Sequence, residues 1–185
     1  MNTTNGKIAV QSKQKMVQSL LKIMEVYEYK DITVTQIVQE ASLSRNTFYR
    51  LFKDKDEILR VLFEDLFDQF FEQVKKQKIE SFWNVMQLYF DFWLEKKDLL
   101  LLLQKNHLLQ RMLEQTYDKS SQVFQFVHAN DKGNEASLPL SYLLAFSVGG
   151  MHNMLIKWVE CGMEIPAKQL IEKLRACLMY DGLSA

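Results

Sequence analysis

Polar and basic residues are concentrated between positions 45 and 53 of this 185-residue chain. They are Arg45, Asn46, Thr47, Tyr49, Arg50 and Lys53. Arginine can donate two hydrogen bonds to guanine, asparagine can pair with adenine, and threonine can contact the methyl group of thymine. Lysine, arginine and tyrosine side chains also bind phosphate oxygens. Together these residue types indicate a surface that recognises double-stranded DNA.

Apolar residues between these positions indicate that the polar cluster lies on one helix. Phe48, Leu51 and Phe52 recur at i, i+3 and i+4, the spacing of one buried helix face. Ser44 is expected to cap the N-terminus of this helix, and Leu43 and Phe48 occupy the positions of a hydrophobic staple. We therefore predict a short helix that buries its aromatic face and presents the polar cluster outward.

A second short helix is predicted just before this one. Ile37, Val38 and Ala41 have the spacing of an inward face. Thr35 is expected to begin and cap this helix, and the chain turns at Ser42. Two helices around a tight turn form a helix-turn-helix, whose second helix fits the major groove of DNA.

The segment 42–59, SLSRNTFYRLFKDKDEIL, resembles the signature of TetR/AcrR-type transcriptional regulators. The residues that match at the family spacing are Ser44, Thr47, Phe48, Tyr49, Phe52, Lys55 and Leu59. The upstream helix also matches through Thr35, Ile37 and Ala41. The family usually has glycine where this chain has Ser42, so Ser42 is expected to adopt a left-handed backbone conformation at a small cost.

The resemblance implies a sequence-specific regulator that binds a DNA operator as a homodimer and responds to a small-molecule effector, most often as a repressor. We expect Arg45, Asn46 and Thr47 to reach base edges, with Arg50 one turn further on. Tyr49 and Lys55 are expected to contact phosphates. The full set of candidate DNA-binding residues is Thr35, Ser44, Arg45, Asn46, Thr47, Tyr49, Arg50, Lys53 and Lys55.

The distribution of charge supports a nucleic-acid partner although the formal net charge is zero. Residues 1–60 carry 10 Lys and Arg against 7 Asp and Glu, whereas residues 61–185 carry 13 against 16. The excess of positive charge therefore lies in the part of the chain that contains the predicted helix-turn-helix.

The fold class that we predict is all-α, because the chain has only 6 glycines and 2 prolines and long stretches without a helix breaker. Asp54 is expected to cap a long helix from Lys55 to about Lys78, with Glu57 completing a capping box. At 1.5 Å per residue this helix would span roughly 36 Å, enough to join two domains. We expect a helix-turn-helix domain at residues 1–54 and a helical ligand-binding and dimerisation domain at residues 55–185.

The remaining predicted helices follow from apolar spacing and from Gly, Pro and capping residues. They cover about residues 12–29, 82–93, 98–112, 117–129, 139–160 and 166–180, with a frayed tail at 1–10 and a loop at 130–139.

Aromatic residues on the predicted helix after Ser81 have two interpretations. Phe82, Met86, Tyr89, Phe90 and Trp93 form one stripe. Such stripes are usually part of a core. The family resemblance favours a ligand pocket at this place, so both readings stay open.

A patch of small residues lies on the predicted helix 140–160. Ala145, Gly149 and Gly150 would allow another helix to approach closely, and that helix could belong to the same chain or to a second copy. The family resemblance implies dimerisation through the last two long helices, 140–160 and 166–180. Residues 82–182 also resemble, more loosely, a subgroup that includes regulators of dihydroxyacetone kinase.

Catalytic and metal chemistry find no support in the sequence. His107, His128 and His152 fall on different predicted helices without a metal-binding spacing, and Cys161 and Cys177 form no ligand pattern. No nucleophile elbow or phosphate-binding loop is present. We therefore expect no enzyme activity, no cofactor and no metal.

No apolar leader and no bilayer-spanning segment is evident, so we expect a cytoplasmic protein without a membrane partner. The alternatives to a ligand-responsive repressor are an activator of the same fold, a regulator controlled by a protein partner, and a helical enzyme or carrier.

Overall fold

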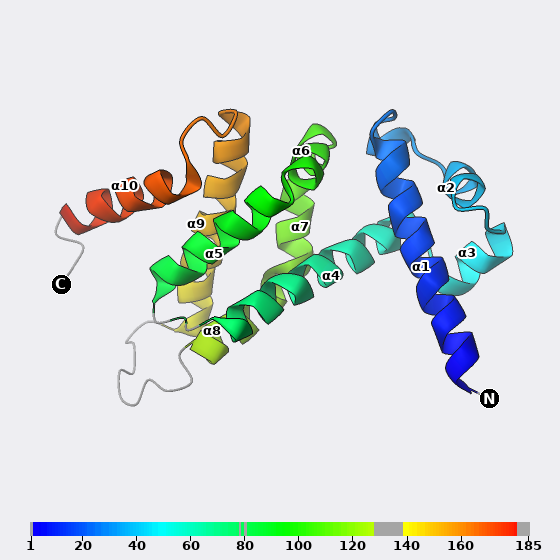
Figure 1. Ribbon diagram of the computed structural model, residues 1–185, viewed down its shortest axis with the longest axis horizontal. Coiled ribbons are helices and arrows are strands. Elements are labelled where there is room, and N and C mark those ends of the chain that lie inside the picture. Colours follow the sequence, from blue (N-terminus) through cyan, green and yellow to red (C-terminus); the bar gives the residue numbers. More distant parts are fainter. Residues whose placement is uncertain (1, 78, 80, 128–138, 181–185) are drawn as a thin grey trace.

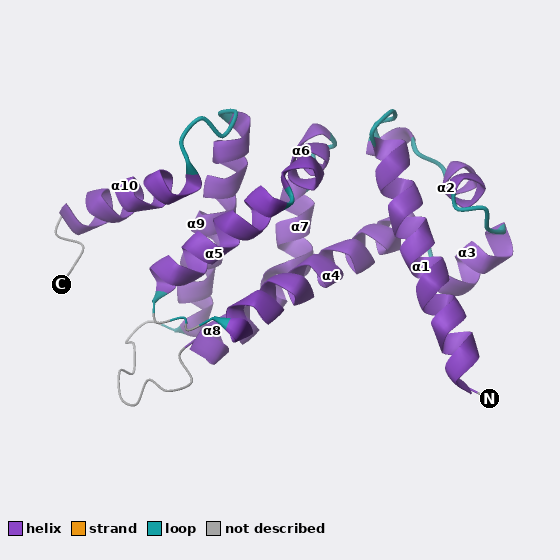
Figure 2. Cartoon of the chain, viewed as in Figure 1, coloured by secondary structure: helices purple, strands orange, loops and turns teal. Residues whose placement is uncertain are grey.

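The computed structural model describes residues 2–77, 79, 81–127 and 139–180, and in this part of the chain the regular structure is entirely helical (Figures 1 and 2). The first elements are α1 (Asn2–Met24), the 3-10 turn η1 (Tyr29–Asp31), α2 (Val34–Glu40), α3 (Arg45–Leu51) and α4 (Lys55–Lys76). They are followed by α5 (Phe82–Glu95), α6 (Lys97–Lys105), α7 (Leu109–Thr116), η2 (Tyr117–Lys119), α8 (Ser120–Val127), α9 (Leu140–Glu160) and α10 (Ala167–Tyr180). We call α1–α3 the head and α5–α10 the body.

Helix α1 differs from its prediction at both ends. It begins at Asn2, where a frayed tail was expected, and it ends at Met24 instead of near Tyr29. Because the chain leaves the helix after Met24, Tyr27 is exposed and does not continue the buried stripe. The buried face consists of Met16, Leu20, Ile23 and Met24, which pack in the core of the head.

Local capping determines where α2 and α3 begin. The N-cap of α2 is Thr33, not Thr35: the backbone N–H of Gln36 donates to Thr33 Oγ1 at 3.3 Å, and the Gln36 side chain accepts from Thr33 N at 2.8 Å. This reciprocal pair satisfies two N–H groups that the helix leaves free. The prediction of Thr35 as the cap was therefore wrong by two residues.

The turn between α2 and α3 confirms two predictions. Ser42 has φ of 53°, the left-handed conformation that glycine adopts more cheaply. Ser44 caps α3, since its Oγ accepts from the backbone N–H of Thr47 at 3.0 Å. On the inner side of the two helices Ile37, Val38 and Phe48 are buried.

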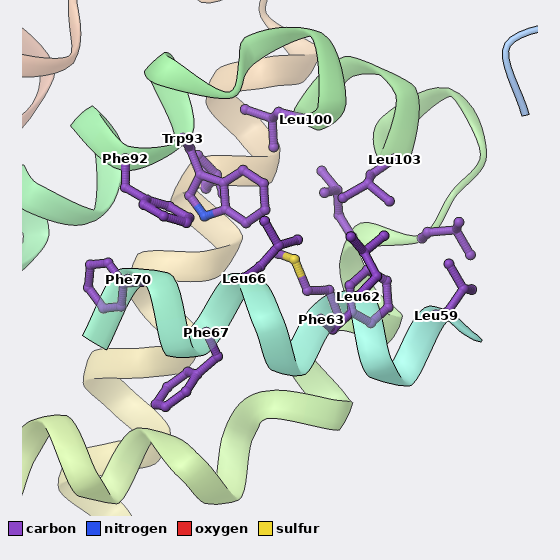
Figure 3. Close-up of a cluster of buried hydrophobic side chains, with 14 of the residues drawn as sticks. Leu59, Leu62, Phe63, Leu66, Phe67, Phe70, Phe92, Trp93, Leu100 and Leu103 are labelled. Carbon is purple, nitrogen blue, oxygen red and sulfur yellow. The ribbon is translucent and has the colours of Figure 1, made fainter. Parts of the chain in front are cut away.

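Helix α4 connects the head to the body (Figure 1). It packs against α1 near its start and against α5, α7 and α8 along the rest of its length. Asp54 caps it as predicted, accepting from Glu57 N at 3.0 Å, but the Glu57 carboxylate accepts from Lys53 N instead of closing the box on Asp54. Figure 3 shows its apolar face in the core of the body, with the side chains Leu59, Leu62, Phe63, Leu66, Phe67 and Phe70 labelled.

The predicted helix 98–112 is two helices in the structure. The chain breaks after α6 because His107 adopts φ of 57°, and α7 then begins at Leu109. A tertiary contact accompanies this break: the Asn106 side chain accepts from the backbone N–H of Tyr29 in the head, at 2.7 Å. Most of the predicted loop 130–139 and the end of the helix predicted at 117–129 lie outside the described residues.

Helices α9 and α10 follow the prediction closely, and the turn between them contains Gly162 with φ of 68°. Trp158 Nε1 donates to the Ile165 carbonyl at 2.7 Å and fixes this turn. Helix α10 packs against α5. Among the described residues, no helix is long and apolar enough to span a bilayer.

Candidate DNA-binding surface and ligand cavity

The outer face of α3 carries the polar residues that the sequence placed there. Arg45, Asn46, Tyr49 and Arg50 are exposed, while Phe48 on the opposite side is fully buried. Tyr49 is 59% exposed although its ring packs edge-on against the ring of Phe48, with the two ring centres 5.2 Å apart. A buried aromatic anchor therefore orients a helix whose other face is free for recognition.

Two candidate residues meet at the junction of α2 and α3. The Arg45 guanidinium donates to Thr35 Oγ1 at 3.0 Å, so these side chains lie side by side at the surface. Ser44 and Thr47 have their hydroxyl oxygens 2.9 Å apart, next to the capping bond that starts α3. Lys53 is exposed just after α3. The structure thus brings Thr35 next to Arg45, and Ser44 next to Thr47, at the start of α3.

Lys55 occupies a different environment. Its Nζ donates to the carbonyls of Tyr29, Lys30 and Ile32 at 2.7, 2.9 and 2.8 Å and lies 4.6 Å from the centre of the Tyr29 ring. Partial burial lowers the pKa of this ammonium group. An ammonium group has three N–H donors, and all three have carbonyl partners here. A phosphate contact by Lys55, as expected from the sequence, would have to displace one of these bonds.

Replacing Lys55 by alanine is expected to lower the free energy of unfolding by about 2 kcal/mol, because hydrogen bonds to a charged donor are lost. Urea denaturation measures this change, and Lys53→Ala, at an exposed site, is the matched control. If Lys55→Ala unfolds like the native protein while its affinity for all DNA sequences falls, the phosphate role holds instead.

A large cavity lies in the body between α4, α5, α7, α8 and α9. Its volume is about 880 Å³, within the range of sites that hold small organic molecules. The walls are mainly aromatic and aliphatic. They include Phe63, Leu66, Phe67 and Phe70 from α4, Val85 and Phe92 from α5, Met112 and Leu113 from α7, Val123 from α8, and Leu143, Leu144 and Met151 from α9.

The predicted aromatic stripe of α5 is divided between cavity and core. Phe82, Tyr89 and Trp93 line the cavity, whereas Met86 and Phe90 do not. Phe90 is fully buried and packs against Trp158 of α9 at a ring distance of 5.4 Å. Of the two readings left open for this stripe, Met86 and Phe90 therefore fit the core, and Phe82, Tyr89 and Trp93 fit a pocket wall.

No sequence pattern indicates that α4 contributes to the cavity. The residues Phe63, Leu66, Phe67 and Phe70 have the same spacing as an ordinary buried helix face. Only their placement opposite α5 and α9 distinguishes a cavity wall from a packed core.

A buried hydrogen-bond chain crosses the cavity wall. Tyr89 O–H lies 3.1 Å from His152 Nδ1, and His152 Nε2 lies 2.8 Å from the Leu109 carbonyl. A carbonyl only accepts, so Nε2 carries a proton and Nδ1 accepts from Tyr89. Burial lowers the pKa of His152 and raises that of Tyr89, so both groups are uncharged near neutral pH.

An exposed recognition helix in a helix-turn-helix, joined to a helical body with an apolar cavity, defines a class of DNA-binding regulator. The family model described as a transcriptional regulator C-terminal region, of TetR type, matches residues 80–180, more than half of the chain. The chain belongs to the TetR family of transcriptional regulators.

A curated relative matches the chain over a shorter stretch. The HTH-type transcriptional regulator HbdR of Aromatoleum sp. (strain CIB) is 26% identical over 74 residues, which is 40% of this chain. The match spans about a third, 32%, of the length of that relative.

Two solved structures share the fold. A putative TetR-family transcriptional regulator from Syntrophomonas wolfei str. Goettingen superposes with a TM-score of 0.66 at 18% identity, covering 88% of this chain and 90% of that one. A TetR transcriptional regulator from Streptococcus agalactiae 2603V gives a TM-score of 0.65 at 17% identity, covering 94% and 96%. The similarity therefore extends over head and body alike.

Proposed function

We propose that this protein is a dimeric repressor that releases its DNA operator when a small molecule occupies the cavity of the body. The observation that carries the proposal is the combination of an exposed polar face on α3 with an apolar cavity whose wall includes α4, the helix that reaches the head. A ligand can regulate DNA binding only if it binds two conformations with different affinities. A helix shared by the cavity and the head can supply that difference.

Recognition of DNA is proposed for the exposed face of α3. Arg45 and Asn46 lie in its first turn, where side chains of a recognition helix contact base edges. Tyr49, Arg50 and Lys53 are suited to phosphates on either side. Thr47 is only half-buried, and its methyl group is suited to contact with thymine.

Selection from a random duplex library tests this function. The protein should enrich a sequence with two-fold symmetry, and the logarithm of its affinity should fall linearly with the logarithm of salt concentration. Absence of both sequence preference and salt dependence would refute DNA recognition by this surface.

Dimerisation is proposed through the outer face of α9. Tyr142 and Phe146 are 64% and 72% exposed, although large aromatic residues are usually buried, and Phe146 also borders the cavity. Gly149, Gly150 and the exposed Asn153 continue the same stripe, and outside the backbone of α9 itself no described residue lies within 4 Å of a Cβ built at either glycine. Among the described residues nothing covers this stripe, so it fits a second copy related by a two-fold axis.

A polar junction between head and body provides a route for the ligand signal. Arg111 of α7 forms an ion pair with Asp56 at 2.7 Å, and the Tyr29 hydroxyl of the head donates to the same carboxylate. The hydrogen bond from Arg111 lowers the pKa of Asp56, so the carboxylate stays charged. The residues that follow on α7, Met112 and Leu113, line the cavity. A ligand that displaces α7 would therefore also disturb Asp56, the carboxylate that accepts from the Tyr29 hydroxyl.

Replacing Arg111 by leucine is expected to uncouple the two sites. The variant should bind an effector found by melting-temperature screening as the native protein does, but the effector should change its DNA affinity about 5-fold less. Fluorescence anisotropy of labelled operator, with and without effector, measures this ratio. Arg60→Leu is the matched control, because Arg60 pairs only with Glu57 and Glu64 among the described residues. If the effector changes DNA affinity by the same factor in both variants, this junction does not transmit the ligand signal.

A further inference from the structure

The cavity is lined by uncharged side chains. Among the described residues none of its lining side chains is Asp, Glu, Lys or Arg, and its only imidazole, His152, is kept neutral by burial, which lowers its pKa. An ion that entered would lose its hydration without gaining an opposite charge. The walls therefore select against carboxylates, phosphates and ammonium groups.

The hydroxyl groups of the cavity have already used their protons. Thr116 donates to the Met112 carbonyl at 2.9 Å, and Ser147 donates to the Leu143 carbonyl at 2.7 Å. Ser120 donates to the Thr116 carbonyl at 3.4 Å. Each of these bonds is made to the carbonyl four residues earlier in the chain, so none of the three hydroxyls offers a free donor to a ligand.

Trp93 is different, because its indole N–H has no hydrogen-bond partner among the described residues although the side chain is only 2% exposed. The neighbouring Tyr89 hydroxyl pairs with His152 Nδ1, and the indole lowers the pKa of Tyr89 against the effect of burial. In Figure 3 the indole nitrogen lies on the edge of the ring turned toward Phe92 and Phe70, and both of these residues line the cavity.

Buried donors are rarely left unpaired in proteins, and a ligand is one of the partners that can complete them. The volume of the cavity, its apolar walls and this single unpaired donor describe the chemistry of one kind of guest. Such a guest carries one oxygen atom that accepts a hydrogen bond. The rest of its surface is apolar, and it carries no charge.

We propose that the effector is an uncharged, largely apolar molecule whose carbonyl oxygen accepts a hydrogen bond from Trp93 Nε1. This inference rests on the proposed function only in calling the guest an effector. The hydrogen bond fixes the orientation of the guest, and the aromatic walls contribute most of the buried contact.

Three probes with one ring system test the inference. They are 2-acetylnaphthalene, 2-ethylnaphthalene and 2-naphthoate, which compare a ketone, a hydrocarbon and an anion. Calorimetric titration of the full-length protein should show the ketone binding about 10-fold more tightly than the hydrocarbon. The naphthoate should bind more weakly than either.

Trp93→Phe removes the donor but keeps an aromatic ring, so it should bring the ketone and hydrocarbon affinities within about 2-fold of each other. Trp83→Phe is the matched control on the same helix, since Trp83 does not line the cavity. A melting curve for each variant confirms that it is folded before titration. The control should retain the native preference for the ketone.

Several outcomes would overturn the inference: naphthoate binding as tightly as the ketone, Trp93→Phe retaining the ketone preference, or none of the probes binding. The proposed function fails separately. If the ketone binds with the expected preference but leaves DNA affinity unchanged, the cavity has the inferred chemistry and the regulatory role is wrong.

Discussion

Replacing Gly150 by arginine is expected to convert the protein from dimers to monomers and to weaken operator binding on the order of 100-fold. The substitution places a long cation on the α9 stripe that carries Phe146 and Tyr142. Outside the backbone of α9, no described residue lies within 4 Å of the new Cβ, so the monomer should fold normally. Two recognition helices bound together gain affinity from each other, and a monomer loses that gain.

Sedimentation velocity and operator titration measure the two effects of Gly150→Arg. Gln110→Arg adds the same charge at an exposed position on α7 and should remain dimeric. If Gly150→Arg sediments as the native dimer does, the two-fold contact must involve another face of the body.

Replacing Arg45 or Asn46 by alanine is expected to cost about 1–3 kcal/mol of operator binding and to relax the preference at particular base pairs. Both side chains lie in the first turn of α3, and Phe48 fixes the orientation of that helix from the buried side. Arg45 already donates to Thr35, so this contact holds the guanidinium near α2 before DNA binds. The loss of affinity should therefore depend on the DNA sequence and not only on the charge of the side chain that is removed.

Lys53→Ala separates base recognition from general attraction to DNA. It removes one positive charge from the same surface and should weaken operator and random duplex alike, with a salt slope reduced by about 1. Comparison of both duplexes by fluorescence anisotropy shows the difference. If Arg45→Ala binds operator and random DNA as the native protein does, Arg45 does not recognise a base.

The helix-turn-helix could be predicted from the sequence because short-range contacts determine it. The caps at Ser44 and Asp54, the buried face of Phe48 and the left-handed Ser42 depend mainly on neighbours within a few positions. The error at Thr35 has the same origin, since two threonines two positions apart are both acceptable caps. Only the pairing of Thr33 with Gln36 decides between them.

Long-range contacts determined what the sequence left open. The break at His107 coincides with the bond between Asn106 and Tyr29, which are far apart in the chain. Lys55 looked like a phosphate ligand because it is a lysine at a helix start. The folded chain instead surrounds its ammonium group with the carbonyl ends of η1.

The family signature, the helical class and the polar face of α3 can be predicted from the amino-acid sequence, because they depend on residue type and spacing along one helix. The cavity, in contrast, exists only once the helices of the body have packed together. An apolar stripe on a helix is wide enough to contact two neighbours, so Trp93 and Tyr89 face the cavity while Phe90 packs against Trp158. The Trp93 N–H is likewise buried without a described partner because of the way five helices pack together. No local sequence pattern encodes that arrangement.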